Sequence, residues 1–168
     1  MSAITPTGPY MKPLAKLADT LATFTSLQTR FGIDTNAADA ATQCRARIYL
    51  PVIDNDRIRD LLPCAVVTPG DNYALRQVAG GSINFIRPSG SLRLILAGES
   101  RHDDLLNDET EMGNWVGAVL TDLIAIAGAS SNLNIHAIRQ ELPIVLPSAE
   151  EENSGGRYFL WSCFIDWD

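Results

Sequence analysis

The order of apolar patterns along the chain restricts its fold more than any other feature. Apolar residues recur every three or four positions at 13–31 and again at 108–127, as in helices with one buried face. Runs of alternating or continuous apolar residues lie between these stretches and after the second one. The order helix, strands, helix, strands predicts an α+β fold, in which two long helices pack on one face of an antiparallel or mixed β-sheet.

Both expected helices carry signals at their ends. Pro13 suits the first turn of the first helix, and Gly32 suits its end. Asp108 and Glu111 have the spacing of a capping box at the start of the second helix, and Gly128 is a suitable end for it. These signals set the expected bounds of the two helices.

The second helix contains a small-residue motif and the most apolar stretch of the chain. Gly113 and Gly117 form the pattern Gly-x-x-x-Gly, which lets another backbone approach closely, and we expect them to pack on the sheet or on the first helix. The stretch 116–129 is interrupted by Thr121 and Asp122 and is too short and too polar to cross a bilayer. The sequence therefore predicts a buried helix and no membrane contact.

Residues 72–97 contain strand-like runs separated by turn residues. Gly80-Gly81 separates the first run from the second, and Pro88-Ser89-Gly90 separates the second from the third, which predicts an antiparallel meander. Basic residues alternate with apolar ones in these runs. The basic residues are Arg76, Arg87 and Arg93. One face of the meander is therefore expected to be apolar and the other basic.

Shorter extended runs complete the expected sheet. They lie at 46–50, 64–68, 135–145 and 158–165. Pro143 suits an edge strand, whereas the last run is apolar on both faces, as in a covered strand.

The length of 168 residues indicates one domain, 1–168, with a core that needs no staple. We expect an N-terminal arm at 1–12 and a flexible acidic loop at 147–156. The cysteines are odd in number and lack a C-x-x-C spacing, so neither a disulfide framework nor a zinc site is indicated. They are Cys44, Cys64 and Cys163.

Charge divides the chain into two unequal parts. The net charge is −7. Residues 1–100 carry 10 basic and 8 acidic side chains, net +2, and residues 101–168 carry 3 basic and 12 acidic ones, net −9. Overall acidity disfavours general phosphate binding. A basic part and an acidic part suit head-to-tail contact between copies, which makes a ring when the rotation closes.

One cluster combines an imidazole with carboxylates. His102, Asp103 and Asp104, with Glu109 or Glu111, have the ligand types for a divalent cation, as in a small metal-dependent hydrolase. The alternative is a solvated loop before a helix N-terminus, where carboxylates are favoured electrostatically. No nucleophile elbow and no phosphate-binding glycine loop accompany the cluster. We therefore expect neither an enzyme nor a cofactor.

The chain ends with an aromatic residue between acids. Trp167 lies between Asp166 and Asp168. Such an end either keeps sheet edges from aggregating or supplies a tryptophan that anchors a subunit contact. Both readings stay open at this level.

The order of elements resembles that of a known protein family. An amphipathic helix at 13–31, a meander at 72–97, a second long helix at 108–127 and two closing strands are similar to the small ring-forming neck proteins of tailed bacteriophages. The tail terminator, or tail completion, proteins are the most similar of these. The likeness covers nearly the whole chain and includes no diagnostic motif.

The resemblance implies a structural subunit of the virion, assembled in the host cytoplasm. Such proteins form a homo-oligomeric ring, in this family a hexamer, at the head-proximal end of the tail tube. The ring ends tube polymerisation and joins the tail tube protein to the head connector or head completion protein. DNA passes through an electronegative lumen without specific binding, which the acidic half of this chain would suit. A head-completion protein and a bacterial adaptor unrelated to viruses are the alternatives.

The same analogy places contacts with neighbouring rings in loops. The candidate loops are 54–60, 99–107 and 147–156. Together with the arginines of the meander and the terminal tryptophan, they predict an interface set. Its members are Asp54, Asp56, Arg57, Arg76, Arg87, Arg93, Arg101, Asp103, Asp104, Glu150, Glu151, Glu152 and Trp167.

Overall fold

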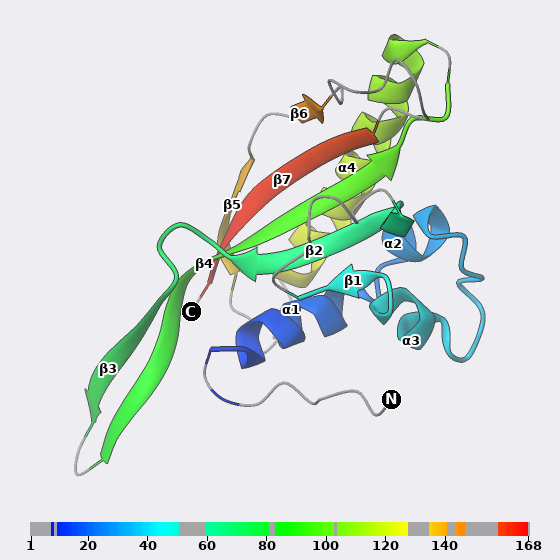
Figure 1. The fold of residues 1–168 in the computed structure, drawn as a ribbon. Helices are drawn as coiled ribbons and strands as arrows, with labels where there is room; N and C mark the ends of the chain where they lie inside the picture. Colours follow the sequence, from blue (N-terminus) through cyan, green and yellow to red (C-terminus); the bar gives the residue numbers. More distant parts are fainter. Residues whose placement is uncertain are drawn as a thin grey trace.

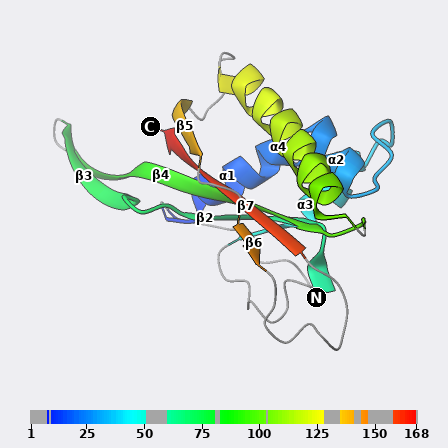
Figure 2. The same ribbon diagram turned by 90° about the horizontal axis from the view of Figure 1, so that it is seen from above.

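The chain has an α+β fold in which helices cover one face of a mixed sheet (Figures 1 and 2). The computed structural model describes residues 8, 10–50, 60–80, 83–102, 104–127, 135–140, 144–146 and 158–167. The helices in these residues are α1 (Lys12–Leu21), α2 (Thr25–Arg30), α3 (Ala40–Arg45) and α4 (Leu105–Ala127). The predicted fold class and the placement of helices on one face are confirmed.

The described strands form one mixed sheet. They are β1 (Ile48–Tyr49), β2 (Cys64–Pro69), β3 (Ala74–Gly80), β4 (Ile83–Glu99), β5 (Ile135–Gln140), β6 (Ile144–Leu146) and β7 (Tyr158–Trp167). Their order is β1-β2-β4-β7-β5, with β3 also paired to β4 and β6 also paired to β7. Only β1 and β2 run parallel among these pairs. The centre of the sheet is therefore the antiparallel pair β4 and β7.

The core lies between the helices and the adjoining face of β2, β4 and β7. Alternate residues of the strands are buried there, as the period of two requires. The buried side chains of the sheet include Val67, Leu92, Leu94, Leu96, Trp161, Cys163 and Ile165, and those of the helices include Leu14, Leu17, Leu21, Leu27, Met112, Val119 and Leu123. Burial of this apolar surface holds the two layers together.

The first predicted helix is wrong in its continuity. The expected helix at 13–31 is two helices, α1 and α2, because Phe24 has an extended backbone with φ −74° and ψ 123°. The amides of Thr23 and Phe24 donate to carbonyls three residues earlier, a tightened turn that ends α1. Both helices still bury their apolar residues in the core, since the break lets each helix pack separately.

The predicted meander is also wrong, because its second and third strands are one strand. β4 continues from Ile83 to Glu99 through the expected turn at 88–90. Gly90 adopts φ +118° and still pairs with Trp167 of β7, so the positive φ bends the strand without reversing it. Residues 74–99 therefore form a single hairpin of β3 and β4.

The structure shifts the start of the second long helix. α4 begins at Leu105, three residues before the predicted position. Asp104 caps it, since its Oδ1 accepts the Leu106 amide at 3.0 Å. The capping box predicted at Asp108 is therefore wrong, because that residue lies one turn inside the helix.

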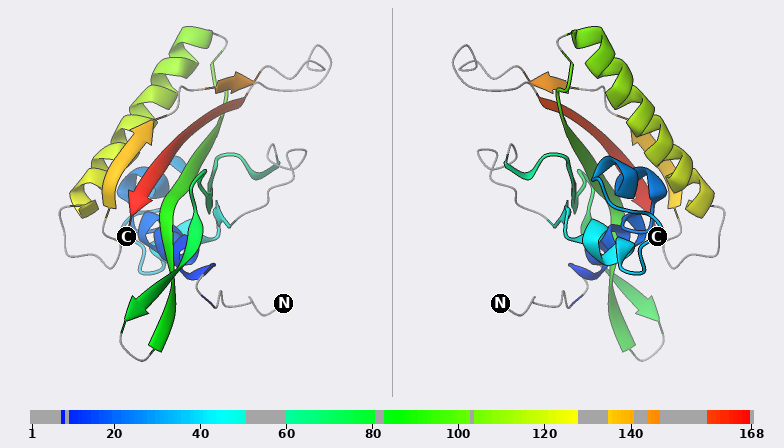
Figure 3. Two further views of the ribbon diagram at one scale, coloured as in Figure 1. Left: turned by 90° about the vertical axis from the view of Figure 1, so that its left-hand side faces the viewer. Right: turned by 90° about the vertical axis from the view of Figure 1, so that its right-hand side faces the viewer.

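Part of the hairpin projects from the molecule. Among the described residues β7 pairs with β4 as far as Gly90, and β3 and residues 83–89 of β4 continue beyond that point as two strands. Figures 1 and 3 show this hairpin extending away from the helices and from the rest of the sheet. None of the described helices is long and apolar enough to span a membrane.

Candidate functional site

The base of the projecting hairpin is built around an irregular step in the strand pairing. Between the pairs Pro69–Leu92 and Ala74–Ser89, the four residues 70–73, which connect β2 to β3, face two residues of β4. Asn72 joins the extra residues to β4, since its Oδ1 accepts a hydrogen bond of 2.7 Å from the backbone amide of Ser91. The step is therefore a bulge held by side-chain hydrogen bonds.

Two glycines make this bulge geometrically possible. A Cβ on Gly90 would lie 2.2 Å from the carbonyl oxygen of Asn72, and a Cβ on Gly70 would lie 2.2 Å from Ser91 Oγ. Gly90 also needs its positive φ. The close approach of the two strands sets the direction in which the hairpin leaves the sheet.

Further polar contacts tie the base to neighbouring segments. The Tyr73 hydroxyl donates to the carbonyl of Tyr10 at 2.6 Å, and their rings meet edge to face at 5.4 Å. Burial, with the nearby Tyr10 hydroxyl, raises the pKa of Tyr73 to about 12. The hydrogen bond from Ser91, partly opposed by desolvation, holds the pKa of Asp71 below its usual range. The base is therefore an ordered part of the described molecule.

The hairpin itself is basic. Residues 72–98 contain three arginines and no acidic residue. The register places Arg76 directly opposite Arg87. Like charges at directly opposite positions disfavour a two-stranded ladder in water. The hairpin thus carries an unfavourable pairing of like charges in its ladder.

The third arginine of the predicted basic face lies on the body of the sheet. Arg93, Phe164 and Arg139 are opposite one another on β4, β7 and β5. The guanidinium carbons of Arg93 and Arg139 lie 5.6 Å and 5.1 Å from the Phe164 ring centre. Arg139 also donates two hydrogen bonds of 3.1 Å to Asp166. This row occupies the face opposite the helices.

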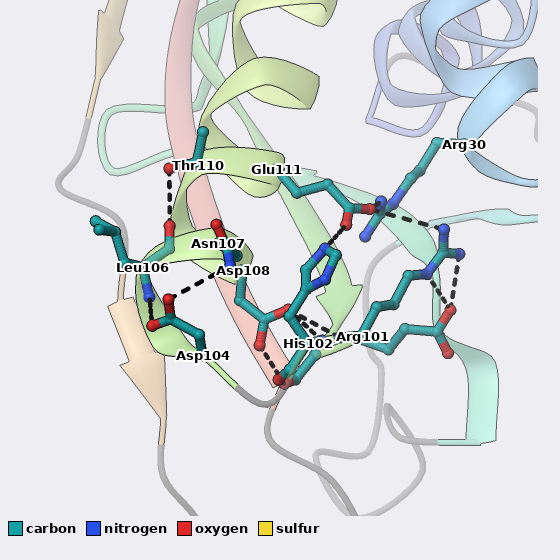
Figure 4. A network of polar contacts seen from close by, with 11 residues as sticks. Arg30, Arg101, His102, Asp104, Leu106, Asn107, Asp108, Thr110 and Glu111 are labelled. Carbon is teal, nitrogen blue, oxygen red and sulfur yellow. Dashed lines mark hydrogen bonds and ion pairs between the residues drawn. The ribbon is translucent and has the colours of Figure 1, made fainter.

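The loop before α4 is held by the first turn of that helix (Figure 4). Asp108 is only 3% exposed and accepts hydrogen bonds from the Ser100 hydroxyl and from the amides of Arg101 (2.8 Å) and His102 (3.0 Å). Burial acts to raise the pKa of Asp108, but these hydrogen bonds outweigh it and hold the pKa below its usual value. Asp108 therefore fixes the loop to α4.

Glu111, one turn further along, is the centre of an ion-pair network. It pairs with Arg30 of α2, lies 2.7 Å from His102 Nε2 and 3.7 Å from Arg101. Desolvation opposes its ionisation, but Arg30, His102 and Arg101 together hold the pKa of Glu111 below its usual range. Arg30 also lies over the Trp115 ring at 5.1 Å. The network joins the loop, α2 and α4.

These contacts occupy the residues of the predicted cation site. His102 faces Glu111, whereas the carboxylate of Asp104 faces Leu106 and Asn107 at the start of α4 (Figure 4). Asp103 lies outside the described residues. Within the described residues no three His, Cys, Asp or Glu side chains are grouped as metal ligands.

The outward face of α4 consists mostly of small side chains. We define the outer face of α4 by its exposed positions, Leu106, Asn107, Glu109, Thr110, Gly113, Asn114, Gly117, Ala118, Thr121, Ile124 and Ala125. The expected close packing of Gly113 and Gly117 on the sheet or on the first helix is wrong, since a Cβ on either would meet nothing within 4 Å. Leu106 and Ile124 are 67% and 65% exposed. The face is therefore unpartnered within the described chain.

A groove runs beside this face, between α2 and α4. It has a volume of about 650 Å³, and Arg30, Trp115 and Asp122 are among its lining residues. Arg30 Nε and Trp115 Nε1 are buried and have no hydrogen-bond acceptor in the described part of the molecule. We call it the α2–α4 groove.

The predicted interface residues fall into separate places. Arg101 and Asp104 lie in and beside the polar network, Arg76 and Arg87 on the hairpin, and Arg93 on the sheet face. Trp167 is half-buried and packs against the core. It pairs with Gly90 of β4, and its Nε1 has no hydrogen-bond acceptor among the described residues. The predicted residues outside the described ranges are Asp54, Asp56, Arg57, Asp103, Glu150, Glu151 and Glu152.

Sequence reasoning missed the outer face of α4, although the helix period carried the signal. Met112, Val116 and Val119 define the buried stripe, and Gly113 and Gly117 are out of phase with it. The row formed by Arg93, Phe164 and Arg139 could not be found this way, because it depends on pairing between distant strands.

Comparison with known proteins adds no relative to this description. No protein-family model matches the chain, and no curated protein matches it either.

Proposed function

We propose that this chain is a structural subunit that forms a ring at the head-proximal end of a phage tail tube. The ring would end tube polymerisation and join the tail to the head connector, with DNA passing through its lumen unbound. The subunit belongs to the virion in this proposal and needs neither catalysis nor a cofactor.

The observation that supports self-assembly is the projecting hairpin. A two-stranded hairpin alone is at best marginally stable in water. Here it extends beyond its own core, pairs Arg76 against Arg87 and has a base fixed by the bulge at Asn72 and Gly90. A partner that covers the hairpin explains why the chain extends it in a fixed direction.

The charge distribution supports a partner that is another copy. The hairpin region is basic, whereas α4 carries Asp108, Glu109, Glu111 and Asp122 and no basic residue. Contact between unlike patches on identical subunits is heterologous, and such contacts form a ring when the rotation between subunits closes. The tail terminator assignment itself rests on the resemblance in the order of elements.

The proposal is tested first by self-association. Purified protein is analysed by sedimentation velocity and light scattering over a range of concentrations, alone and with tail tubes as template. A ring or a concentration-dependent oligomer is expected. The matched control replaces residues 74–89 by a short Gly-Ser turn, and this variant should stay folded and monomeric.

The tail-specific part is tested by electron microscopy of particles made without this protein. Tails of uncontrolled length, separated from heads, are the expected result. Tails of normal length that merely fail to join heads would instead indicate a head-completion protein. Normal joined particles would overturn the proposal.

A further inference from the structure

We infer that the projecting hairpin of one copy docks on the outer face of α4 and in the α2–α4 groove of the next copy. This inference rests on the proposed function, because it names the contact that would build the ring. It assigns the hairpin and α4 as the two halves of one heterologous interface.

The first step is placement within the subunit. Figures 1 and 3 show the hairpin projecting at one end of the molecule, whereas α4 begins at the other end and lies along the body. The hairpin of one subunit therefore cannot contact the outer face of α4 in the same subunit. The contact must be made head to tail between copies.

The second step is the shape of the receiving surface. Gly113 and Gly117 leave open space above the helix backbone, and Ala118 and Thr121 continue the small surface toward the groove. An approaching strand pair can therefore come close to the α4 backbone. Exposed Leu106 and Ile124 lie near the two ends of this surface and supply apolar contact.

The third step is charge. Glu109 lies on one side of the small residues and Asp122 on the other. Asp122 accepts the Ser26 hydroxyl at 2.6 Å, and neither carboxylate has an ion-pair partner among the described residues. Arg76 and Arg87 of an incoming hairpin provide the missing positive charge.

The fourth step concerns hydrogen bonding in the groove. Arg30 Nε and Trp115 Nε1 are buried donors without an acceptor in the described molecule, and both side chains line the groove. A strand edge presents unpaired carbonyls, and β3 has one edge that pairs with no described strand. The hairpin thus brings carbonyl acceptors to a groove in which these two donors have none.

The competing receptor for the hairpin is the edge of β5 that pairs with no described strand. That strand is the last in the sheet order, so an added strand could pair with it. Its charged or titratable side chains are His136 and Arg139, with no acidic residue. A basic hairpin is therefore better matched by α4 than by β5.

A charge-exchange experiment tests the inference. One variant carries R76E and R87E, and the other carries Glu109→Lys and Asp122→Lys. Each variant alone should associate at least tenfold more weakly than the wild type, because like charges then meet. An equimolar mixture should regain assembly, since each hairpin finds an opposite charge on the other variant's α4.

A steric variant with a matched control completes the test. Gly113→Gln with Gly117→Gln should block assembly without lowering the melting temperature of the monomer, because both positions are open. Ala137→Lys on β5, which would repel a basic hairpin at that strand, should leave assembly unchanged. Loss of assembly with Ala137→Lys alone would assign the docking site to β5 and overturn the inference.

The possible failures are distinguishable. If the wild type assembles and the α4 variants assemble equally well, the docking inference is wrong and the ring proposal stands. If the wild type stays monomeric even with tail tubes, the docking inference and the ring proposal are both wrong.

Discussion

At the residue scale, Asp108 shows how one buried carboxylate organises a loop. Its oxygens accept the Ser100 hydroxyl and the amides of Arg101 and His102. Hydrogen bonds to an ionised group stabilise a fold more than neutral ones do, and a buried donor that loses its acceptor is costly. The loop before α4 should therefore depend on this side chain more than on any other in the network.

We predict that Asp108→Asn lowers the free energy of unfolding at pH 7 by about 2 kcal/mol. The amide keeps the size of the side chain but removes its charge and replaces one acceptor with a donor. Urea denaturation followed by circular dichroism measures the change. Asp104→Asn is the control, because asparagine also caps helices well and should change stability little.

The pH dependence follows from the lowered pKa values of Asp108 and Glu111. A carboxylate whose pKa is lower in the folded state contributes its full stabilisation above its unfolded pKa, near 3.8 and 4.5 for these residues. The contribution is lost as the pH falls through the folded pKa. Unfolding free energy should therefore fall below about pH 4.5 in the wild type and fall less in Asp108→Asn. Urea denaturation at several pH values measures this free energy. The same fall with decreasing pH in the wild type and in Asp108→Asn would contradict the prediction.

Gly117 gives a second prediction at this scale. Since its added Cβ meets nothing within 4 Å, Gly117→Ala should stabilise the isolated subunit by about 0.5–1 kcal/mol through helix propensity. Chemical denaturation at a concentration where the protein is monomeric checks this. A loss of stability would show that the glycine packs against part of the chain.

At the scale of elements, the hairpin depends on a base of few residues. Gly90 has φ +118°, and Asn72 closes the bulge by accepting the Ser91 amide. The ladder beyond this point has no third strand among the described elements. The bulge therefore decides whether the hairpin keeps one direction.

We predict that Gly90→Ala loosens the hairpin while leaving the core folded. The added Cβ would lie 2.2 Å from a backbone oxygen of Asn72, so the two strands must separate. Amide hydrogen exchange should quicken at least tenfold in 74–80 and 83–89, with protection of β7 residues 158–165 unchanged. Global unfolding instead would show that the base is part of the core.

At the scale of the whole molecule, charge is segregated between distant ends. The hairpin region carries arginines without acids, and α4 carries acids without bases. Separated patches of this kind attract between molecules and are screened by salt.

Subunit association should therefore weaken as salt rises. Raising the ionic strength from about 0.1 M to about 1 M shortens the Debye screening length from about 10 Å to about 3 Å. We expect the association constant from sedimentation equilibrium to fall at least tenfold over this range. An association that strengthens with salt would indicate an apolar interface in place of the charged one.

Local pattern was sufficient for a large part of the fold and for little of the candidate site. The α+β class, the buried residues of α4 and the alternation in β4 follow from periods of 3.6 and 2, which depend only on near neighbours. The break at Phe24 and the cap at Asp104 were not predicted, because each depends on packing or on a choice among nearby polar residues.

The chain's local chemistry settled which faces are apolar, in what order the elements come and where the charges lie. Tertiary structure alone decided that β4 runs through Pro88-Ser89-Gly90 and that the hairpin projects. Such residues permit either a reversal or a bend. The continued pairing of β4 with β7 up to Gly90 selects the bend, and beyond Gly90 no third described strand pairs with the hairpin.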